Sequence, residues 1–263
     1  MSTTLRVMSY NILFGGVSDG AGGSEDRTGL LTSVVKAVRP DVLALNECCG
    51  FAEDGGARMR AFCDAVGMEG ELAVAPSGFH VALLHREPWR PASKSTTTAA
   101  MHHGLVRMML TDGTHEVNVV ATHLNPYSSL GRLQEAQMAV SQTRPGEPSL
   151  VMGDFNSLPA GYDGPLFARR LMDEEMRPET HVCEYFARAG FVDVLAARGV
   201  TSHTYPTPLV HRPNYALAPV RLDYVMASGE LASACTSAWV VETPEAERAS
   251  DHLPVVAEFA LGG

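Results

Sequence analysis

Short apolar runs recur along the chain, and most of them end in a polar side chain. Residues 5–12 alternate apolar with polar positions, the two-residue period of a strand with one buried face, and lead into the glycine-rich stretch 15–23. Similar short runs predict strands at 42–45, 81–84, 105–110, 117–121, 149–152, 222–226 and 255–259. The stretches 15–23 and 205–219 are interpreted as surface loops.

The segments between these strands carry a helical period. Residues 28–38 place their apolar side chains on one helical face and stop before Arg39-Pro40. Further helices are predicted at 57–66, 130–140 and 183–189. Strands and helices mix irregularly, so the pattern favours an α/β (α+β) sandwich of mixed sheets covered by helices over a doubly wound parallel sheet. We find neither repeat nor linker, so residues 1–263 are predicted to form a single catalytic domain.

The composition indicates the class of protein and the cellular compartment. Of 263 residues, 45% are hydrophobic and 19% charged, so the chain can bury a sizeable core. No apolar run approaches the roughly 20 residues that span a bilayer, and the N-terminus shows no signal-peptide pattern, so we expect no membrane association. The five cysteines have no C-x-x-C spacing, which favours neither a disulfide framework nor a zinc site. We therefore predict a cytoplasmic protein, with its oligomeric state open.

The net charge bears on the substrate. A formal charge of −10 with scattered basic residues is unlike a protein that holds duplex DNA along a basic stripe. The fold can still gather basic residues into a patch. The charge nevertheless favours a small phosphorylated substrate over a polymeric nucleic acid.

The polar residues at the predicted strand ends are acids, amides and imidazoles. They are Asn11, Glu47, His123, Asn125, Asp154, Asn156, Asp223, Asp251 and His252. Neither a Gly-x-Ser-x-Gly nucleophile turn nor a Walker-type phosphate loop occurs. Oxygen-rich ligands of this kind suit a hard cation such as Mg²⁺, with Mn²⁺ as a substitute.

These residues fall into six short motifs spread over residues 9 to 252. They are Ser9-Tyr10-Asn11, Asn46-Glu47, Thr122-His123-Leu124, Gly153-Asp154-Phe155-Asn156, Arg221-Leu222-Asp223-Tyr224 and Ser250-Asp251-His252. In this order they resemble the endonuclease/exonuclease/phosphatase superfamily, the DNase I-like group. The resemblance implies a four-layer α/β/β/α sandwich, with two packed mixed β-sheets flanked by helices. It also implies a Mg²⁺-dependent phosphoester hydrolase, in which water attacks phosphorus in line without a covalent intermediate.

The resemblance also implies roles on the metal side of the site. Glu47 would be the main metal ligand, because a carboxylate is needed to hold the cation. Asn11 would coordinate through its amide oxygen or hold a water on the metal. Asp251 would hold the metal through water or brace the site. Leu13 stands where some abasic-site nucleases carry an acid, which argues against a second tight metal.

The remaining roles concern the reaction itself. Asp154 would orient or deprotonate the attacking water, and Asn156 would hydrogen-bond that water or a phosphate oxygen. His252 would stabilise the growing negative charge, with Asp223 fixing its tautomer. Contacts to the phosphate from the opposite side are implied for His123 and Asn125.

Several of these residues also have simpler interpretations. Asp154 and Asn156 could form an ordinary Asx turn, but the ordered set of motifs favours function. His102-His103 lie loosely where DNase I-like relatives place a phosphate-contacting Arg, so His103 is a candidate substrate-binding residue, although a structural histidine is the better interpretation. The loop that carries His203, Tyr205, His211 and Arg212 could line substrate access or be an ordinary polar loop.

Three functional hypotheses remain beside a hydrolase of small phosphoesters. A nuclease or nucleic-acid end-processing phosphodiesterase is the first alternative, because loops rather than the scaffold decide the substrate. A site reused for non-hydrolytic chemistry on a non-phosphate metabolite is the second. A binding protein that has lost hydrolysis predicts loss of Glu47, Asp154 or His252, and all three are present.

Overall fold

A computed structural model describes residues 3–17, 25–165, 169–209 and 218–262. His211 and Arg212, considered above as substrate-access residues, lie outside this range, as does much of the two predicted loops. None of the described helices is long and apolar enough to cross a membrane.

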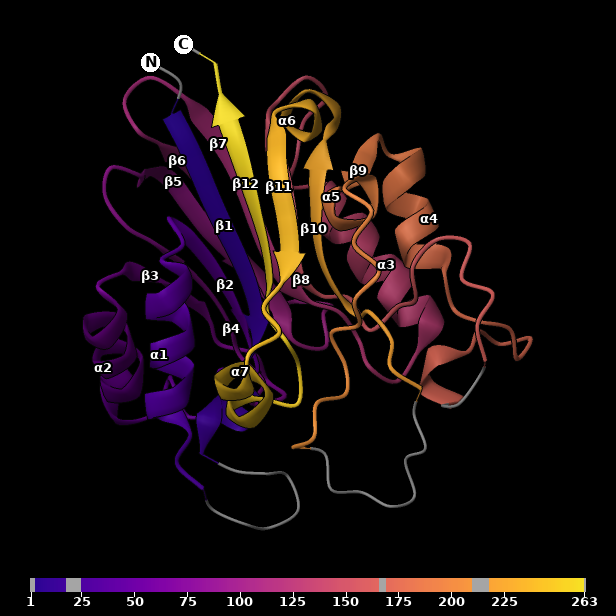
Figure 1. Cartoon of the computed structure of the whole chain (residues 1–263), viewed down its shortest axis with the longest axis horizontal. Coiled ribbons are helices and arrows are strands. Elements are labelled where there is room, and N and C mark those ends of the chain that lie inside the picture. Colours follow the sequence, from indigo (N-terminus) through magenta and orange to yellow (C-terminus); the bar gives the residue numbers. More distant parts are fainter. Residues whose placement is uncertain (1–2, 18–24, 166–168, 210–217, 263) are drawn as a thin grey trace.

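The strands form two mixed, six-stranded sheets (Figure 1). The first sheet has the order β11 (Cys235–Val240), β12 (Val255–Leu261), β1 (Thr3–Asn11), β2 (Val42–Asn46), β4 (Val81–His85) and β3 (Glu69–Ala73). The second has the order β5 (Arg90–Thr97), β6 (Gly104–Thr111), β7 (Glu116–His123), β8 (Ser149–Asp154), β10 (Asp223–Ser228) and β9 (Phe191–Asp193). Within each sheet one central pair is parallel, β1 with β2 and β7 with β8, and the other pairs are antiparallel.

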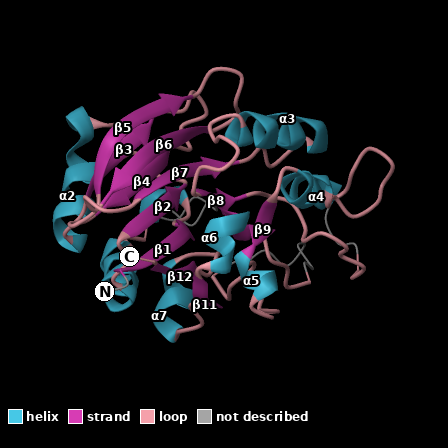
Figure 2. Cartoon of the chain, turned by 90° about the horizontal axis from the view of Figure 1, so that it is seen from above, coloured by secondary structure: helices cyan, strands magenta, loops and turns pink. Residues whose placement is uncertain are grey.

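Helices cover the outer face of each sheet (Figure 2). The first sheet is covered by α1 (Thr28–Val38), α2 (Ala57–Val66) and α7 (Pro244–Ala249), and the second by α3 (Ser129–Val140) and α4 (His181–Arg188). Short helices α5 (Val194–Ala197) and α6 (Gly229–Ser233) and 3-10 turns η1 (Phe14–Gly16), η2 (Asp54–Gly56) and η3 (Arg169–Leu171) complete the described chain. The predicted four-layer sandwich is therefore confirmed.

Burial explains why the strong patterns predicted their elements correctly. Every residue of β2 and β4 is buried, since one face of these strands meets the second sheet and the other meets helices. Helices α1 and α2 have the predicted bounds, 28–38 and 57–66, while α3 and α4 each begin slightly earlier than predicted.

Four strands were not predicted. Strand β5 is polar and almost wholly exposed, so its sequence has no apolar alternation to detect. Strands β3 and β11 have mostly exposed or half-buried residues, and β9 has three residues. All four lie at or next to a sheet edge, where hydrogen bonds to one neighbour define the strand better than side-chain burial does.

The register of the strands brings the candidate residues together. In the parallel pairs, Asn11 lies level with Asn46 and His123 level with Asp154, so both pairs finish at the same end of the sandwich. Strand β10 runs the other way and begins there, with Asp223 opposite Asp154. The strand ends from both sheets thus surround one point, at the lower end of the molecule in Figure 1.

Candidate active site

One side of the cluster is built by β1, β2 and the turn that follows each. The Asn11 amide nitrogen donates to Glu47 Oε1 and to Asp154 Oδ2, both at 3.1 Å, and so bridges the two carboxylates. The Asn11 amide oxygen accepts from the Leu13 N–H at 3.1 Å, which fixes the orientation of the amide. This hydrogen bond uses one of the two lone pairs of the amide oxygen and leaves the other for a metal or a water.

Glu47 is half-buried and follows β2 with a left-handed backbone, at φ 59. Its second carboxylate oxygen accepts from the Phe14 N–H at 3.1 Å. Burial and the neighbouring charge of Asp251 raise the pKa of Glu47 to about 7. A raised pKa means that the surrounding protein alone does not stabilise the negative charge of this carboxylate well.

Asp154 ends β8 at the centre of the cluster. Besides Asn11, its Oδ2 faces His123 Nε2 at 3.5 Å and His252 Nε2 at 3.7 Å, while Oδ1 accepts from the Asn156 N–H at 2.9 Å. Burial raises its pKa to about 6, although the His252 charge opposes the shift. A carboxylate with this pKa can accept a proton near neutral pH and release it again.

His252 and Asp223 form a buried pair next to Asp154. The Nδ1 atom of His252 lies 2.8 Å from Asp223 Oδ2. Burial alone would lower the pKa of His252, but Asp223 and Asp154 outweigh it and raise the pKa to about 10. The imidazole is therefore a cation at neutral pH, with Nε2–H directed toward the side of Asp154.

His123 is a neutral imidazole on the other side of Asp154. Burial and the nearby histidines hold its pKa well below the ordinary value. Its Nε2 accepts from the Asn156 amide nitrogen at 3.0 Å, which places the proton on Nδ1. That buried Nδ1 has no hydrogen-bond partner among the described residues. Asn156 also donates to the Leu124 carbonyl at 3.1 Å, so both of its amide hydrogens are used.

Two further predicted residues lie around this core. Asp251 is half-buried, and burial raises its pKa against the opposing charges of His252 and Arg170. His103 is buried, and its ring stacks on that of His123 with ring centroids 4.1 Å apart.

The side-chain oxygen of Asn125 is engaged in a turn. This oxygen accepts from the N–H groups of Tyr127 and Ser128, at 2.8 and 3.1 Å, and so forms the turn before α3. The amide nitrogen is the only part of the Asn125 side chain that these turn bonds leave for a substrate.

Several residues that sequence reasoning did not identify hold the cluster in place. The Asn46 amide joins the two sheets, because it donates to the Thr122 carbonyl at 2.9 Å and accepts from the Asp154 N–H at 3.0 Å. Ser250 donates to the Asn11 carbonyl at 2.6 Å and thereby ties the His252 segment to β1. Asn46 and Ser250 belong to the quoted motifs, so their position in the sequence was the available signal.

Two arginines near the cluster had no such signal. Arg27 is buried and donates to the carbonyls of Leu13 and Ala249, and the charge of Glu47 acts on it. Arg170 packs over the ring of Tyr205, with its Cζ 5.0 Å from the ring centroid. Both belong to segments without strand or motif character, so only the fold reveals their proximity to the carboxylates.

The donor set suits a divalent oxygen-binding cation. Ligand atoms of Asp154, Asp223 and His252 lie within 4.8 Å of one another, but His252 is protonated and bound to Asp223, so it has no free lone pair for a metal. Glu47 and Asp251 offer carboxylates whose pKa values burial raises, and both are half-buried and reachable from solvent. A divalent cation held by these oxygens would offset their charge.

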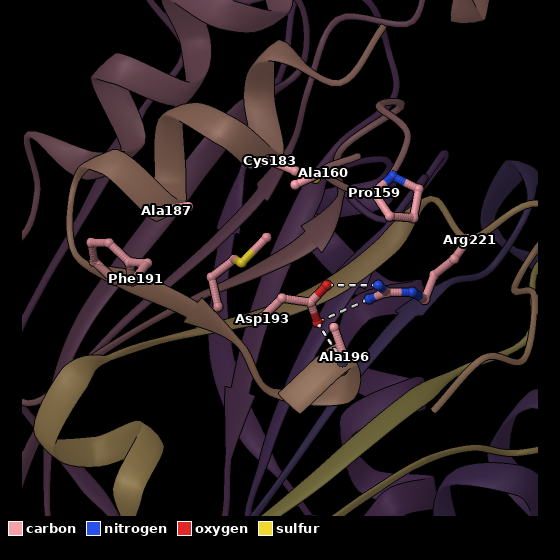
Figure 3. Close-up of a pocket in the computed structure, with 9 residues that line it drawn as sticks. Pro159, Ala160, Cys183, Ala187, Phe191, Asp193, Ala196 and Arg221 are labelled. Carbon is pink, nitrogen blue, oxygen red and sulfur yellow. Dashed lines mark hydrogen bonds and ion pairs between the residues drawn. The ribbon is translucent and has the colours of Figure 1, made fainter. Parts of the chain in front are cut away.

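A separate cavity of about 110 Å³ lies between α4, α5 and the start of β10 (Figure 3). Its walls include Cys183, Ala187 and Phe191, and the ion pair between Arg221 and Asp193 closes one side. Its lining includes none of the candidate site residues. The cavity is therefore distinct from the cluster at the strand ends.

The four-layer sandwich with acids and imidazoles at its strand ends is the architecture of phosphoesterase-type proteins. The chain belongs to the Endonuclease/Exonuclease/phosphatase family, whose sequence profile matches residues 8–252. Members of this family are hydrolytic nucleases and phosphatases. No curated protein sequence matches the chain.

Solved structures share the fold at low sequence identity. An endonuclease/exonuclease/phosphatase from Beutenbergia cavernae aligns with a TM-score of 0.72 and 20% identity, covering 99% of this chain and 72% of that one. An AP endonuclease from Archaeoglobus fulgidus gives 0.74 and 19%, over 97% and 99% of the two chains. TDP2 from Caenorhabditis elegans gives 0.68 and 18%, over 98% of each chain.

Proposed function

We propose that the protein is a Mg²⁺-dependent phosphoester hydrolase that acts on a small phosphorylated substrate, with residues 1–263 as one catalytic domain. The observation that carries this proposal is the arrangement around Asp154. A carboxylate with a pKa of about 6 lies between a neutral imidazole, His123, and a cationic one, His252, and is bridged to Glu47. This arrangement provides a proton acceptor, hydrogen-bond donors and a cation site around one point.

Glu47 and Asp251 are the proposed metal-binding carboxylates. Magnesium held there would supply positive charge to the phosphoryl and leaving oxygens. Asn11 fixes both carboxylates by donating to Glu47 and Asp154, and its proposed further contribution is to coordinate the metal, or to hold a water on it, through the second lone pair of its amide oxygen. Mn²⁺ suits the same oxygen ligands.

The proton transfer is assigned to Asp154. We propose that it takes a proton from the attacking water, because its raised pKa lets it act near neutral pH. The amide hydrogens of Asn156 are both engaged, so its oxygen is the atom that can accept a hydrogen bond from that water. Asp154 and Asn156 thus orient the water from two sides.

The two histidines are proposed to stabilise the negative charge that develops on the phosphoryl oxygens. His252 donates as a cation whose orientation and protonation Asp223 maintains. His123 contributes a neutral N–H from its unpartnered Nδ1, and the stacked His103 holds that ring from behind. Asn125 is a secondary candidate, acting through its amide nitrogen.

One observation favours the alternative of a nucleic-acid end-processing phosphodiesterase. Aromatic rings form a chain beside the cluster, from Phe14 to Phe79 at 5.3 Å and from His102 to Tyr127 at 5.3 Å between centroids, and His103 joins the two pairs. The Tyr127 side chain is 76% exposed. Exposed rings near a phosphate site can stack on nucleobases. The AP endonuclease and TDP2, whose solved structures share this fold, are in keeping with this alternative.

A substrate screen tests the proposed activity. Phosphomonoesters, dinucleotides, plasmid DNA and lipid phosphodiesters are incubated with Mg²⁺, Mn²⁺ or EDTA, and phosphate or product release is measured. We expect hydrolysis that depends on the metal and that falls by about three orders of magnitude in Asp154→Asn, because this change removes the proton acceptor. An enzyme that is inert toward every ester, or equally active in EDTA, contradicts the proposal.

A further inference from the structure

Arg170 is a cation with unused hydrogen-bond donors beside the candidate site. Its Nε and Nη2 atoms are buried and have no hydrogen-bond partner among the residues that the structure describes. A buried donor that lacks a partner destabilises the fold, and more so when the group is charged. Such a group is retained when a ligand supplies the missing acceptors.

The fold holds Arg170 in place through a buried neighbour. Arg132 donates to the Arg170 carbonyl at 2.7 Å and to the Asn125 carbonyl at 2.9 Å, and it forms a fully buried ion pair with Glu179 at 2.9 Å. The 3-10 turn that contains Arg170 is thereby fixed to the segment that follows His123. A buried arginine thus anchors the backbone of Arg170 while the Arg170 guanidinium has donors to spare.

The guanidinium lies beside the candidate site. It packs on the ring of Tyr205, and that ring also contacts His252, with ring centroids 4.7 Å apart. The positive charge of Arg170 also acts on Asp251 and on His123. Arg170 therefore shares the Tyr205 ring with His252 and lies near enough to the cluster for its charge to act on Asp251 and His123.

We propose that Arg170 is a specificity-determining residue that binds phosphoryl oxygens through Nε–H and Nη2–H and makes the site prefer dianionic phosphomonoesters. This inference rests on the proposed phosphoester hydrolase function. A guanidinium presents parallel N–H groups whose spacing matches two phosphate oxygens. The ring of Tyr205, whose centroid lies 5.0 Å from Cζ, limits the orientations that the guanidinium can take.

The preference for a monoester follows from charge and from the number of oxygens. Four carboxylates, Glu47, Asp154, Asp223 and Asp251, repel a dianion more strongly than a monoanion. The guanidinium of Arg170, a cation in addition to His252 and the metal, offsets this repulsion. A monoester also has one more anionic oxygen than a diester, and Arg170 provides the extra donors that this oxygen requires.

Binding of inorganic phosphate to the magnesium-loaded protein tests the contact itself. The affinity, measured by calorimetry, is expected to fall at least about tenfold in Arg170→Gln, since each hydrogen bond to a charged group contributes about 1.5–3 kcal/mol. Arg170→Lys keeps the charge without the fork and is expected to lie between the two. Arg144→Gln removes an equal charge from the exposed loop before β8 and should bind phosphate as the wild type does.

Selectivity is tested with two esters that share a leaving group, p-nitrophenyl phosphate and its methyl ester. We expect Arg170→Gln to lower kcat/KM for the monoester about 100-fold and for the diester less than about fivefold. Unchanged phosphate binding, or equal losses on the two esters, overturns the assignment of Arg170. A wild-type protein that hydrolyses neither ester refutes the hydrolase proposal instead, while the phosphate titration still reports on Arg170 independently.

Discussion

At the residue scale, four of the eight described non-glycine residues with positive φ lie at or beside the site, among them Leu13. Phe14, Glu47 and Asn156 have φ values of 50, 59 and 50, in the left-handed region that most side chains avoid. Each such residue costs on the order of 1–3 kcal/mol, and the cost is maintained where the surrounding structure requires it. At Glu47 the turn allows the carbonyl to accept from Gly15 and Cys49 while the carboxylate faces Asn11. Local strain here orients the groups on which the proposed chemistry depends.

The pair of His252 and Asp223 leads to a prediction about pH. His252 acts as a cation, so kcat/KM should decline on the alkaline side as this histidine loses its proton at its pKa of about 10. In Asp223→Asn the main stabilising charge is lost, and the alkaline limb should move down by more than about one pH unit. The pH profile of kcat/KM measures the shift.

A distant pair of the same kind provides the control. His115 Nδ1 lies 3.0 Å from Asp112 Oδ2, in the turn between β6 and β7. Asp112→Asn should leave the profile unchanged. If Asp223→Asn keeps the wild-type alkaline limb, His252 is not the group that titrates there.

A site residue could be predicted from the sequence only where it belongs to a short motif next to an apolar strand. Glu47 and Asp154 stand in short motifs at the ends of the apolar strands β2 and β8, and His252 stands in a motif just before β12; pairing of these strands within the two sheets brings the motifs to one end of the sandwich. Arg170 lies in an irregular segment, and nothing in its neighbouring residues predicts contact with Tyr205. The orientation of Asn11 was also beyond the sequence, because it depends on a hydrogen bond from Leu13 that exists only in the folded turn.

At the element scale, an ion pair joins β9 to the start of β10. Arg221 donates to both oxygens of Asp193, at 2.9 and 2.6 Å, and the two side chains are 7% and 17% exposed. Arg221→Gln leaves Asp193 without its cation, so we expect a loss of about 2 kcal/mol in the free energy of unfolding. Urea denaturation measures this loss.

The matched control lies on α4. Arg188 pairs with Glu184 at 3.6 Å, but the Arg188 side chain is 65% exposed, so Arg188→Gln should cost less than about 0.5 kcal/mol. Equal effects of the two substitutions would show that burial does not distinguish these ion pairs. The comparison also tests whether the pair beside the cavity stabilises the segment that leads to Asp223.

Elements were predictable where burial imposes a period on the sequence. Strands β2 and β4 are buried throughout, and α1 buries one face, so their sequences reveal them. Strand β5 exists because β6 offers it backbone partners along its length, and its side chains are largely solvated. A strand that is held by backbone hydrogen bonds to a neighbour, with solvated side chains, cannot be recognised from its amino-acid types.

At the scale of the whole molecule, metal binding and folding stability should be linked through protons. The pKa values of Glu47 and Asp154, about 7 and about 6, are raised above their ordinary values by burial. Near pH 5–6 the folded protein thus binds more protons at these carboxylates than the unfolded chain does. This proton binding contributes fully to the free energy of unfolding at about pH 4, and the contribution is lost as pH rises through 6–7. Magnesium favours the ionised carboxylates, so its stabilising effect should grow over the same range.

Thermal unfolding with and without Mg²⁺ at pH 5 and pH 8 measures this linkage. We expect the rise in Tm to be larger at pH 8, because protons no longer compete for the carboxylates. Glu47→Gln removes a proposed metal ligand and should abolish most of the difference. A magnesium effect that is equal at both pH values would argue against Glu47 and Asp154 as the groups that respond to the metal.

The net charge of the molecule distinguishes a small substrate from a polyanion. A formal charge of −10 repels nucleic acid at long range, whereas Arg170 and His252 act within the site over a few ångströms. Salt screens the long-range part, and a protein that contacts six or more phosphates loses about 10³-fold in affinity between 50 and 200 mM salt. For a small phosphomonoester we expect kcat/KM to change less than about threefold over that interval. A dinucleotide and a long oligonucleotide assayed in parallel complete the test, and a steep loss confined to the oligonucleotide, together with higher activity on it at low salt, would support the end-processing phosphodiesterase instead.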